Sequence, residues 1–102
     1  MKIRTGISMF AMMLVSATAI AQGDTTYKAK CQSCHGATGV PSAGMVKSMG
    51  VKPVTDPDVK AMDEAKMIDI TTNGVRKMPA FKGKLTDAQI KEAVDHYRKL
   101  IK

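Results

Sequence analysis

Cys31-Gln32-Ser33-Cys34-His35 is the stretch that decides the fold of this 102-residue chain. Two cysteines three positions apart lie on nearly the same face of one helical turn, so both sulfurs can bond one edge of a porphyrin. The histidine that follows directly can turn its imidazole under the porphyrin plane. This spacing is typical of the attachment site of a c-type haem, with Cys31 and Cys34 bonded to the vinyl groups and His35 bound to the iron.

Three other interpretations of the two cysteines fit the sequence less well. A disulfide between Cys31 and Cys34 suits an exported protein, but it would close a very small loop and gain little entropy. A thiol oxidoreductase would need a strand before the motif and a βαβ unit, and the sequence predicts neither. A zinc site usually has four ligands. The chain contains no cysteine or histidine other than Cys31, Cys34, His35 and His96.

The first 21 residues have the pattern of a secretory signal peptide. Lys2 and Arg4 precede a mainly apolar run over residues 7–20, and Ala19-Ile20-Ala21 is a small-x-small cleavage site. A retained membrane anchor is the alternative, but this run of 14 residues is shorter than the roughly 20 that an apolar span needs. We therefore predict cleavage after Ala21.

Cleavage of residues 1–21 would leave residues 22–102 as one small domain. It would carry 14 basic and 9 acidic side chains, which is a net charge of +5. A domain of 81 residues buries a limited core, so a large apolar cofactor at its centre would supply much of the missing apolar surface. We expect a soluble, periplasmic or otherwise exported monomer with no transmembrane anchor after cleavage. We expect no binding to nucleic acid, because export removes the opportunity and no recognition motif is present.

Helix signals run through the mature chain, and no alternating apolar pattern is long enough to predict a paired strand. A helix that Asp24 can cap runs into Cys31. Further helices are expected over residues 42–49, residues 58–72 and from residue 86 onward. The last of these begins with a capping box formed by Thr86 and Gln89.

The last helix has the clearest apolar stripe in the chain. Ile90, Val94, Tyr97 and Ile101 recur at helical spacing and predict a buried face. His96 lies roughly 120° from this stripe at 100° per residue, so we expect an exposed histidine.

A haem bound by one histidine either takes a second axial ligand from the chain or leaves that position open. The candidates are Met45, Met49, Met62, Met67, Met78 and His96. Met78 is preferred, because Pro79 pushes it out of the helical region and because it follows a helix stop at Asn73-Gly74. Met62 and Met67 belong to an expected helix, where methionine more often fills the core.

These stretches together resemble a small single-haem class I cytochrome c of the bacterial type. The matching residues are Gly23 and Tyr27, Cys31 to Gly36, Asn73-Gly74, Met78-Pro79-Ala80-Phe81, Leu85 to Ile90, and Tyr97. The resemblance implies an all-α class I cytochrome c fold, with three to five short helices around one covalently bound haem c. It also implies His35 and Met78 as axial ligands, and terminal helices that cross at Gly23 and Tyr27. The family usually has a proline whose carbonyl accepts the histidine ring N–H, and whether Pro41 fills this role is open.

The resemblance implies an electron carrier and not an enzyme, with redox proteins as its partners. The alternatives are a haem-based sensor of small ligands, in which Met78 dissociates, and a peroxidase-like protein, which would need an open iron and a distal acid/base group. Basic side chains flank Met78, namely Arg76, Lys77, Lys82 and Lys84. They form either a docking face for an acidic partner or an ordinary solvated surface.

Overall fold

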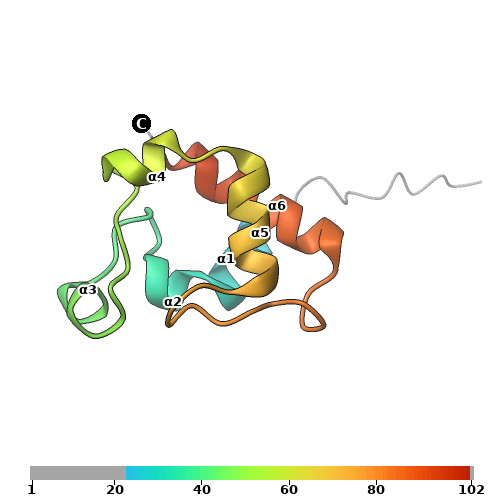
Figure 1. Cartoon of the computed structure of the whole chain (residues 1–102), viewed down its shortest axis with the longest axis horizontal. Helices are drawn as coiled ribbons and strands as arrows, with labels where there is room; N and C mark the ends of the chain where they lie inside the picture. The colour runs from blue at the N-terminus through green and yellow to red at the C-terminus, as the bar shows by residue number, and fades with distance from the viewer. Residues whose placement is uncertain (1–22, 102) are drawn as a thin grey trace, which may run out of the picture.

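The computed structural model describes residues 23–101, so the predicted signal peptide and its cleavage site lie outside the described residues. This part of the chain contains six α-helices and no strand beyond two isolated bridges. The helices are α1 (Gly23–Lys30), α2 (Gln32–His35), α3 (Ala43–Met49), α4 (Pro57–Ala61), α5 (Glu64–Asn73) and α6 (Asp87–Lys99) (Figure 1). The all-α fold expected from the sequence is confirmed.

Polar side chains just before the helices explain where three of them begin. Ser42 and Asp56 each accept a hydrogen bond from a backbone N–H in the first turn of α3 and α4, and Pro57 occupies the first turn of α4. Thr86 and Gln89 form the expected capping box at the start of α6, because each side chain bonds the backbone N–H of the other. The sequence therefore determines these boundaries locally.

The prediction of a single helix over residues 58–72 is wrong. Met62 has extended backbone angles (φ −78°, ψ 131°), and it separates α4 from α5. Asp63 then caps α5 by accepting a hydrogen bond of 2.8 Å from the backbone N–H of Lys66. A second helix start thus lies inside a run of good helix formers. This break, together with a turn at Cys31 between α1 and α2, gives six helices where three to five were expected.

The two terminal helices of the described chain, α1 and α6, pack against each other, and α5 packs against α6 (Figure 1). A Cβ atom on Gly23 would lie 2.5 Å from the carbonyl oxygen of Glu92, so only glycine allows α1 to come this close to α6. Tyr27 from α1 and Ile90 from α6 are the most deeply buried large side chains, each 1% exposed. The crossing that the family resemblance implies is therefore present.

His96 is half-buried, which corrects the expected exposed histidine. Its ring centroid lies 5.0 Å from that of Tyr27. The close approach at Gly23 brings α1 over a wider part of α6 than the apolar stripe alone covers, and His96 falls under that wider contact.

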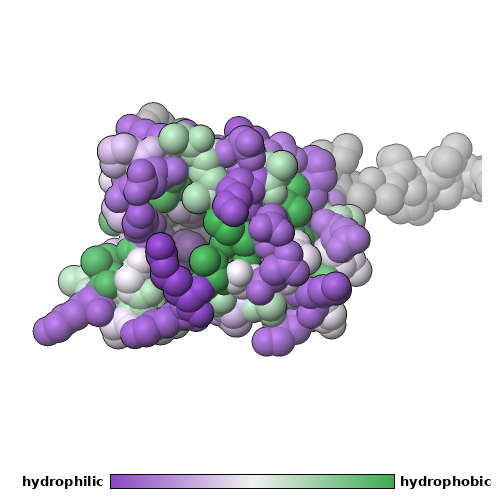
Figure 2. All heavy atoms as spheres, viewed as in Figure 1, coloured by the Kyte–Doolittle hydropathy of each residue, from purple (hydrophilic) through white to green (hydrophobic). Residues whose placement is uncertain are grey.

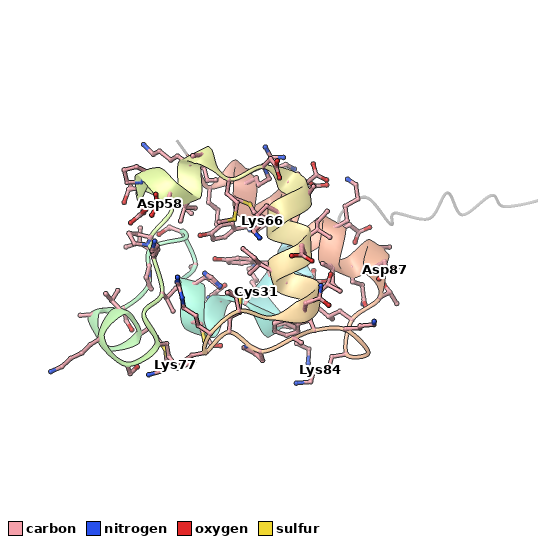
Figure 3. All side chains as sticks on the ribbon, in the orientation of Figure 1. Cys31, Asp58, Lys66, Lys77, Lys84 and Asp87 are labelled. Carbon is pink, nitrogen blue, oxygen red and sulfur yellow. The ribbon has the colours of Figure 1, made fainter. Side chains whose placement is uncertain are left out.

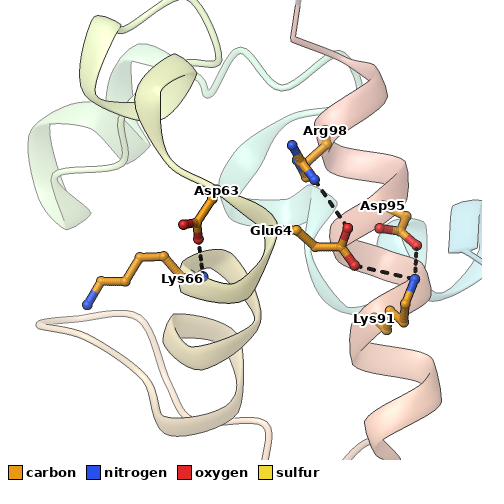
Figure 4. A network of polar contacts seen from close by, with 6 residues as sticks. All are labelled: Asp63, Glu64, Lys66, Lys91, Asp95 and Arg98. Atoms are coloured by element: carbon orange, nitrogen blue, oxygen red, sulfur yellow. Dashed lines mark hydrogen bonds and ion pairs between the residues drawn. The ribbon is translucent and has the colours of Figure 1, made fainter.

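A polar network on the outside connects α5 to α6. Glu64 accepts from Lys91 at 3.3 Å and from Arg98 at 3.2 Å, and Lys91 also pairs with Asp95 at 2.8 Å (Figure 4). Exposed ion pairs of this kind each contribute only about 0–1 kcal/mol. The network therefore adds little to the stability of the fold.

Within residues 23–101, no helix combines the length and the apolar character that crossing a membrane would require.

Candidate functional site

A cavity of about 440 Å³ lies at the centre of the molecule and is lined by residues from all six helices. Its volume falls within the roughly 300–1,000 Å³ that is usual for sites that bind small molecules and cofactors. Apolar side chains group at the centre of the face shown in Figure 2, and hydrophilic side chains surround them. The fold is thus built around a space suited to an apolar ligand with a polar edge.

One turn of chain carries three of the predicted site residues into this cavity. The backbone N–H of Cys31 bonds the carbonyl of Tyr27 at 2.9 Å, and that of His35 bonds the carbonyl of Cys31 at 3.0 Å. The chain therefore continues almost helically from α1 through α2, and Cys31, Cys34 and His35 all line the cavity. This is the arrangement that the spacing of the three residues predicts.

The two cysteines have the properties of structural thiols, not of redox catalysts. Both are free, and burial, followed by the neighbouring Cys34, raises the pKa of the Cys31 thiol to about 11. A thiol oxidoreductase needs the opposite shift, and free thiols also disfavour the disulfide. Among residues 23–101, no group of three or more histidine, cysteine and acidic residues is placed to hold a metal ion.

The His35 imidazole is held as a neutral ring beside an aromatic side chain. Burial lowers the pKa of His35, and the neutral imidazole is the form that binds metals. Its ring meets the edge of Tyr97 at a centroid distance of 5.3 Å and an angle of 69°. Pro41 is buried nearby, next to the tight turn at Gly36, and its orienting role stays a prediction.

Met78 reaches the cavity from a loop whose backbone is tightly constrained. Val75 and Met78 exchange two backbone hydrogen bonds, of 3.1 Å and 2.9 Å. Between them Arg76 has φ 52°, the left-handed region that residues with a Cβ rarely adopt. The loop then returns to α5, where Thr71 accepts from the backbone N–H of Phe81 at 3.0 Å. Met78 is half-buried and lines the cavity.

The other candidate axial ligands divide into two groups. Met49, Met62 and Met67 also line the cavity, whereas Met45 does not. His96 lies instead at an open groove of about 880 Å³ on the outer side of α1 and α6. The structure therefore brings four methionines around the space next to Cys31, Cys34 and His35, and Met78 is among them.

The rim of the cavity is strongly basic. It carries five cationic side chains, which are Lys30, Lys52, Lys66, Arg76 and Lys77. Asp58 is the one acidic residue among the lining residues, and it pairs with Lys52 at 2.9 Å. We call these five cations the basic rim.

Sequence reasoning found only part of this rim. Lys30 and Lys66 were not predicted, although each directly precedes a cavity residue, Cys31 and Met67. Lys82 and Lys84, which were predicted, are exposed but do not line the cavity. Lys77, which is labelled in Figure 3, donates a hydrogen bond of 2.7 Å to the carbonyl of Ser48, so its ammonium also connects the Met78 loop to α3.

Comparison with known proteins identifies the family. The family model described as cytochrome C oxidase, cbb3-type, subunit III, matches residues 18–96. The chain belongs to this family. A solved structure named KustC0563 c-type cytochrome superposes with a TM-score of 0.70 at 28% identity, covering 78% of this chain and 98% of that one. The protein is therefore a small class I c-type cytochrome, as the sequence predicts.

A curated relative of the cytochrome is the cbb3-type cytochrome c oxidase subunit CcoP of Azospirillum sp. (strain B510). The two are 37% identical over 76 residues, which is 71% of this chain but 25% of the relative. The cytochrome thus spans about a quarter of the length of that relative.

The cavity residues fit the haem that a c-type cytochrome holds covalently. Two free thiols on one turn, a neutral imidazole next to them and a thioether from the opposite loop are the donors that such a group needs. The apolar lining suits the porphyrin face, and the basic rim suits its propionates.

Proposed function

We propose that the cytochrome is an exported one-electron carrier with a single haem. In this proposal residues 1–21 are a cleaved signal peptide, and residues 22–102 form the carrier domain. Cys31 and Cys34 hold the haem covalently, and His35 and Met78 are the axial ligands. The observation that carries the proposal is that these four side chains, and no second histidine, line one apolar cavity.

When bound, the haem iron supplies a couple that accepts and releases one electron. Residues of the chain set the reduction potential of this couple. The thioether of Met78 is a soft donor that favours ferrous iron, and it raises the potential relative to two histidine ligands. The apolar lining excludes water and disfavours the more highly charged state of the site. His35 and Met78 would together leave no position on the iron for substrate.

Met78 is preferred to the other three cavity methionines because of how each is held. Met67 is 6% exposed and belongs to the buried core cluster, and Met62 packs against that cluster. Met49 lies at the end of α3, a helix without a buried residue. Two backbone hydrogen bonds to Val75 close the turn that carries Met78, so its sulfur can be held in one place at low conformational cost.

The partners in this proposal are redox proteins with an acidic docking face. The basic rim surrounds the cavity mouth and would meet such a face close to the cofactor edge. The relative from Azospirillum is named as an oxidase subunit, and this supports a terminal oxidase as the class of acceptor.

A sensor of small ligands and a peroxidase-like protein are the rival functions. Both need an iron with an open or labile sixth position. The peroxidase also needs a distal acid/base group, and His96, the only other histidine of the chain, lies at the outer groove and not at the cavity.

Two measurements test the proposal. Mass spectrometry of the exported protein under denaturing conditions is expected to show a chain that begins at Gln22 and carries the added mass of one haem. The oxidised absorption spectrum is expected to be low-spin, with a sulfur-to-iron charge-transfer band. A high-spin spectrum, together with rapid binding of carbon monoxide after reduction, would instead support the rival functions.

A further inference from the structure

The hydroxyl of Tyr27 makes the one polar contact between the α1 side chains and the turn that carries His35. It donates a hydrogen bond of 2.6 Å to the carbonyl oxygen of Gly36. The Tyr27 side chain is 1% exposed, so water does not compete for this bond. Burial also raises the pKa of the phenol well above its usual value, which keeps the donor proton in place. An apolar ring would have filled the same volume between α1 and α6 without reaching Gly36.

Gly36 is fixed on its other sides as well. Its backbone N–H bonds the carbonyl of Gln32 at 2.8 Å, and its φ of 83° lies in the left-handed region. A Cβ atom at this position would overlap the carbonyl oxygen of Val40. Gly36 is therefore held at both of its backbone polar groups, its N–H by Gln32 and its carbonyl by the Tyr27 hydroxyl.

The same tyrosine also acts on His35 through a second ring. Tyr27 and Tyr97 lie 6.2 Å apart between centroids, and Tyr97 in turn meets the His35 imidazole edge-on at 5.3 Å. Both distances fall within the range of favourable aromatic contacts, roughly 4.5–7 Å. The backbone after His35 and the ring of His35 are thus both held by one packed pair of tyrosines.

We infer that Tyr27 is a positioning residue for the proximal ligand: by holding the Gly36 carbonyl, its hydroxyl sets the direction in which the His35 imidazole enters the cavity. The inference rests on the proposed function, in which His35 is the nitrogen ligand. It assigns the hydroxyl a role in tuning the site that is separate from the packing of the ring between α1 and α6.

The test compares two variants of the haem-loaded protein that each lose one hydroxyl bonded to a backbone carbonyl. Tyr27→Phe keeps the ring and removes the bond to Gly36. Thr72→Val is the matched control, because it removes a part-buried hydroxyl that donates 2.7 Å to the Ile68 carbonyl, and Thr72 does not line the cavity. Electron paramagnetic resonance of the ferric form reports the orientation of the axial imidazole, and a potentiometric titration reports the potential.

Tyr27→Phe is expected to shift and broaden the largest g value and to raise the reduction potential, because a less well aligned imidazole donates less charge to ferric iron. Thr72→Val is expected to leave both unchanged. The inference is overturned if Tyr27→Phe lowers only the thermal midpoint, with g values unmoved and the potential unchanged or lower. It is also overturned if both variants shift equally. Failure of the proposed function would look different from failure of this inference. In that case the wild-type protein itself would lack a low-spin ferric signal.

Discussion

At the scale of single residues, the most unusual backbone conformation belongs to Arg76. It has φ 52°, and no other non-glycine residue in the described part of the chain has a positive φ. This conformation costs a residue with a Cβ about 1–2 kcal/mol. The strain lies two residues before Met78, in the turn that presents the proposed ligand, and backbone strain is often concentrated at such sites. The two backbone hydrogen bonds between Val75 and Met78 stabilise the turn despite this strain.

The strain at Arg76 can be measured with two substitutions that remove the same charge. Arg76→Gly is expected to be more stable than Arg76→Ala by about 1 kcal/mol, because glycine adopts a positive φ without steric cost. Thermal unfolding of the haem-loaded variants gives the difference. Equal midpoints for the two variants would mean that the turn relaxes and that Arg76 carries no strain.

The sequence allowed prediction of the residues whose relation is local. Cys31, Cys34 and His35 share one helical turn, so their spacing is enough to predict that they line one side of a site. Met78 could be preferred because Pro79 restricts it, but no local pattern indicates which other methionines face the cavity. The bond between Lys77 and Ser48 joins residues 29 positions apart, and no local pattern predicts such a contact.

At the scale of elements, the contact between α1 and α6 depends on a missing side chain. The closest approach is at Gly23, where a Cβ would meet the Glu92 carbonyl at 2.5 Å. A backbone carbonyl inside a helix cannot move away at low cost. The glycine therefore sets the distance between the helices that pack Tyr27 and Tyr97 against the site.

Two glycine-to-alanine substitutions are expected to act in opposite directions. Gly23→Ala should destabilise the protein by roughly 1–3 kcal/mol, because the added methyl overpacks the helix crossing. Gly44→Ala, in the exposed helix α3, should stabilise it by about 0.5–1 kcal/mol, since the nearest atom to its new Cβ is 3.9 Å away. Denaturant unfolding measures both. A neutral Gly23→Ala would show that α1 can shift and that the close approach is not required.

Helix starts were predicted better than helix continuity. Thr86 was predicted as a cap because a capping side chain acts within three residues, and Ser42 and Asp56 cap α3 and α4 by the same local contact. The break at Met62 and Asp63 was missed because no glycine or proline marks it, and strong helix formers lie on both sides. His96 was placed wrongly because its burial comes from α1, which lies far from it in sequence.

At the scale of the whole molecule, the core is small for an independent fold. Eight apolar side chains are buried among the described residues. Five of them line the cavity, namely Tyr27, Val59, Met67, Ala93 and Val94. Domains of this size are marginally stable without a cofactor or a cross-link.

Removal of the haem attachment is therefore expected to prevent folding. The double variant Cys31→Ser with Cys34→Ser should give a chain without a cooperative thermal transition, because nothing else fills the cavity. Far-UV circular dichroism on heating provides the measurement. A cooperative transition in this variant would show that the protein core is sufficient by itself.

The basic rim makes a prediction about association with an acidic redox partner. Lys30 and Lys66 are exposed on the rim, whereas Lys28 and Lys99 are exposed but do not line the cavity. Lys30→Glu with Lys66→Glu should slow bimolecular electron transfer at low salt by an order of magnitude or more, with little change in potential. Stopped-flow mixing at several salt concentrations measures the rate.

The control for this experiment is Lys28→Glu with Lys99→Glu, which changes the net charge by the same amount. It should slow the reaction much less, because rim charges act mainly on the on-rate through local steering. Equal losses for the two pairs would show that only net charge matters and that the rim is not a docking face.

The central claim is that His35 and Met78 close both faces of one covalently held haem. It is tested most directly by the oxidised absorption spectrum of Met78→Ala, measured beside Met49→Ala, Met62→Ala and Met67→Ala, the variants of the other three cavity methionines. We predict that only Met78→Ala loses the sulfur-to-iron charge-transfer band, keeps its covalent haem, falls in potential and binds carbon monoxide when reduced. A band that persists in Met78→Ala and disappears in one of the other three variants would contradict the account and would identify that methionine as the ligand.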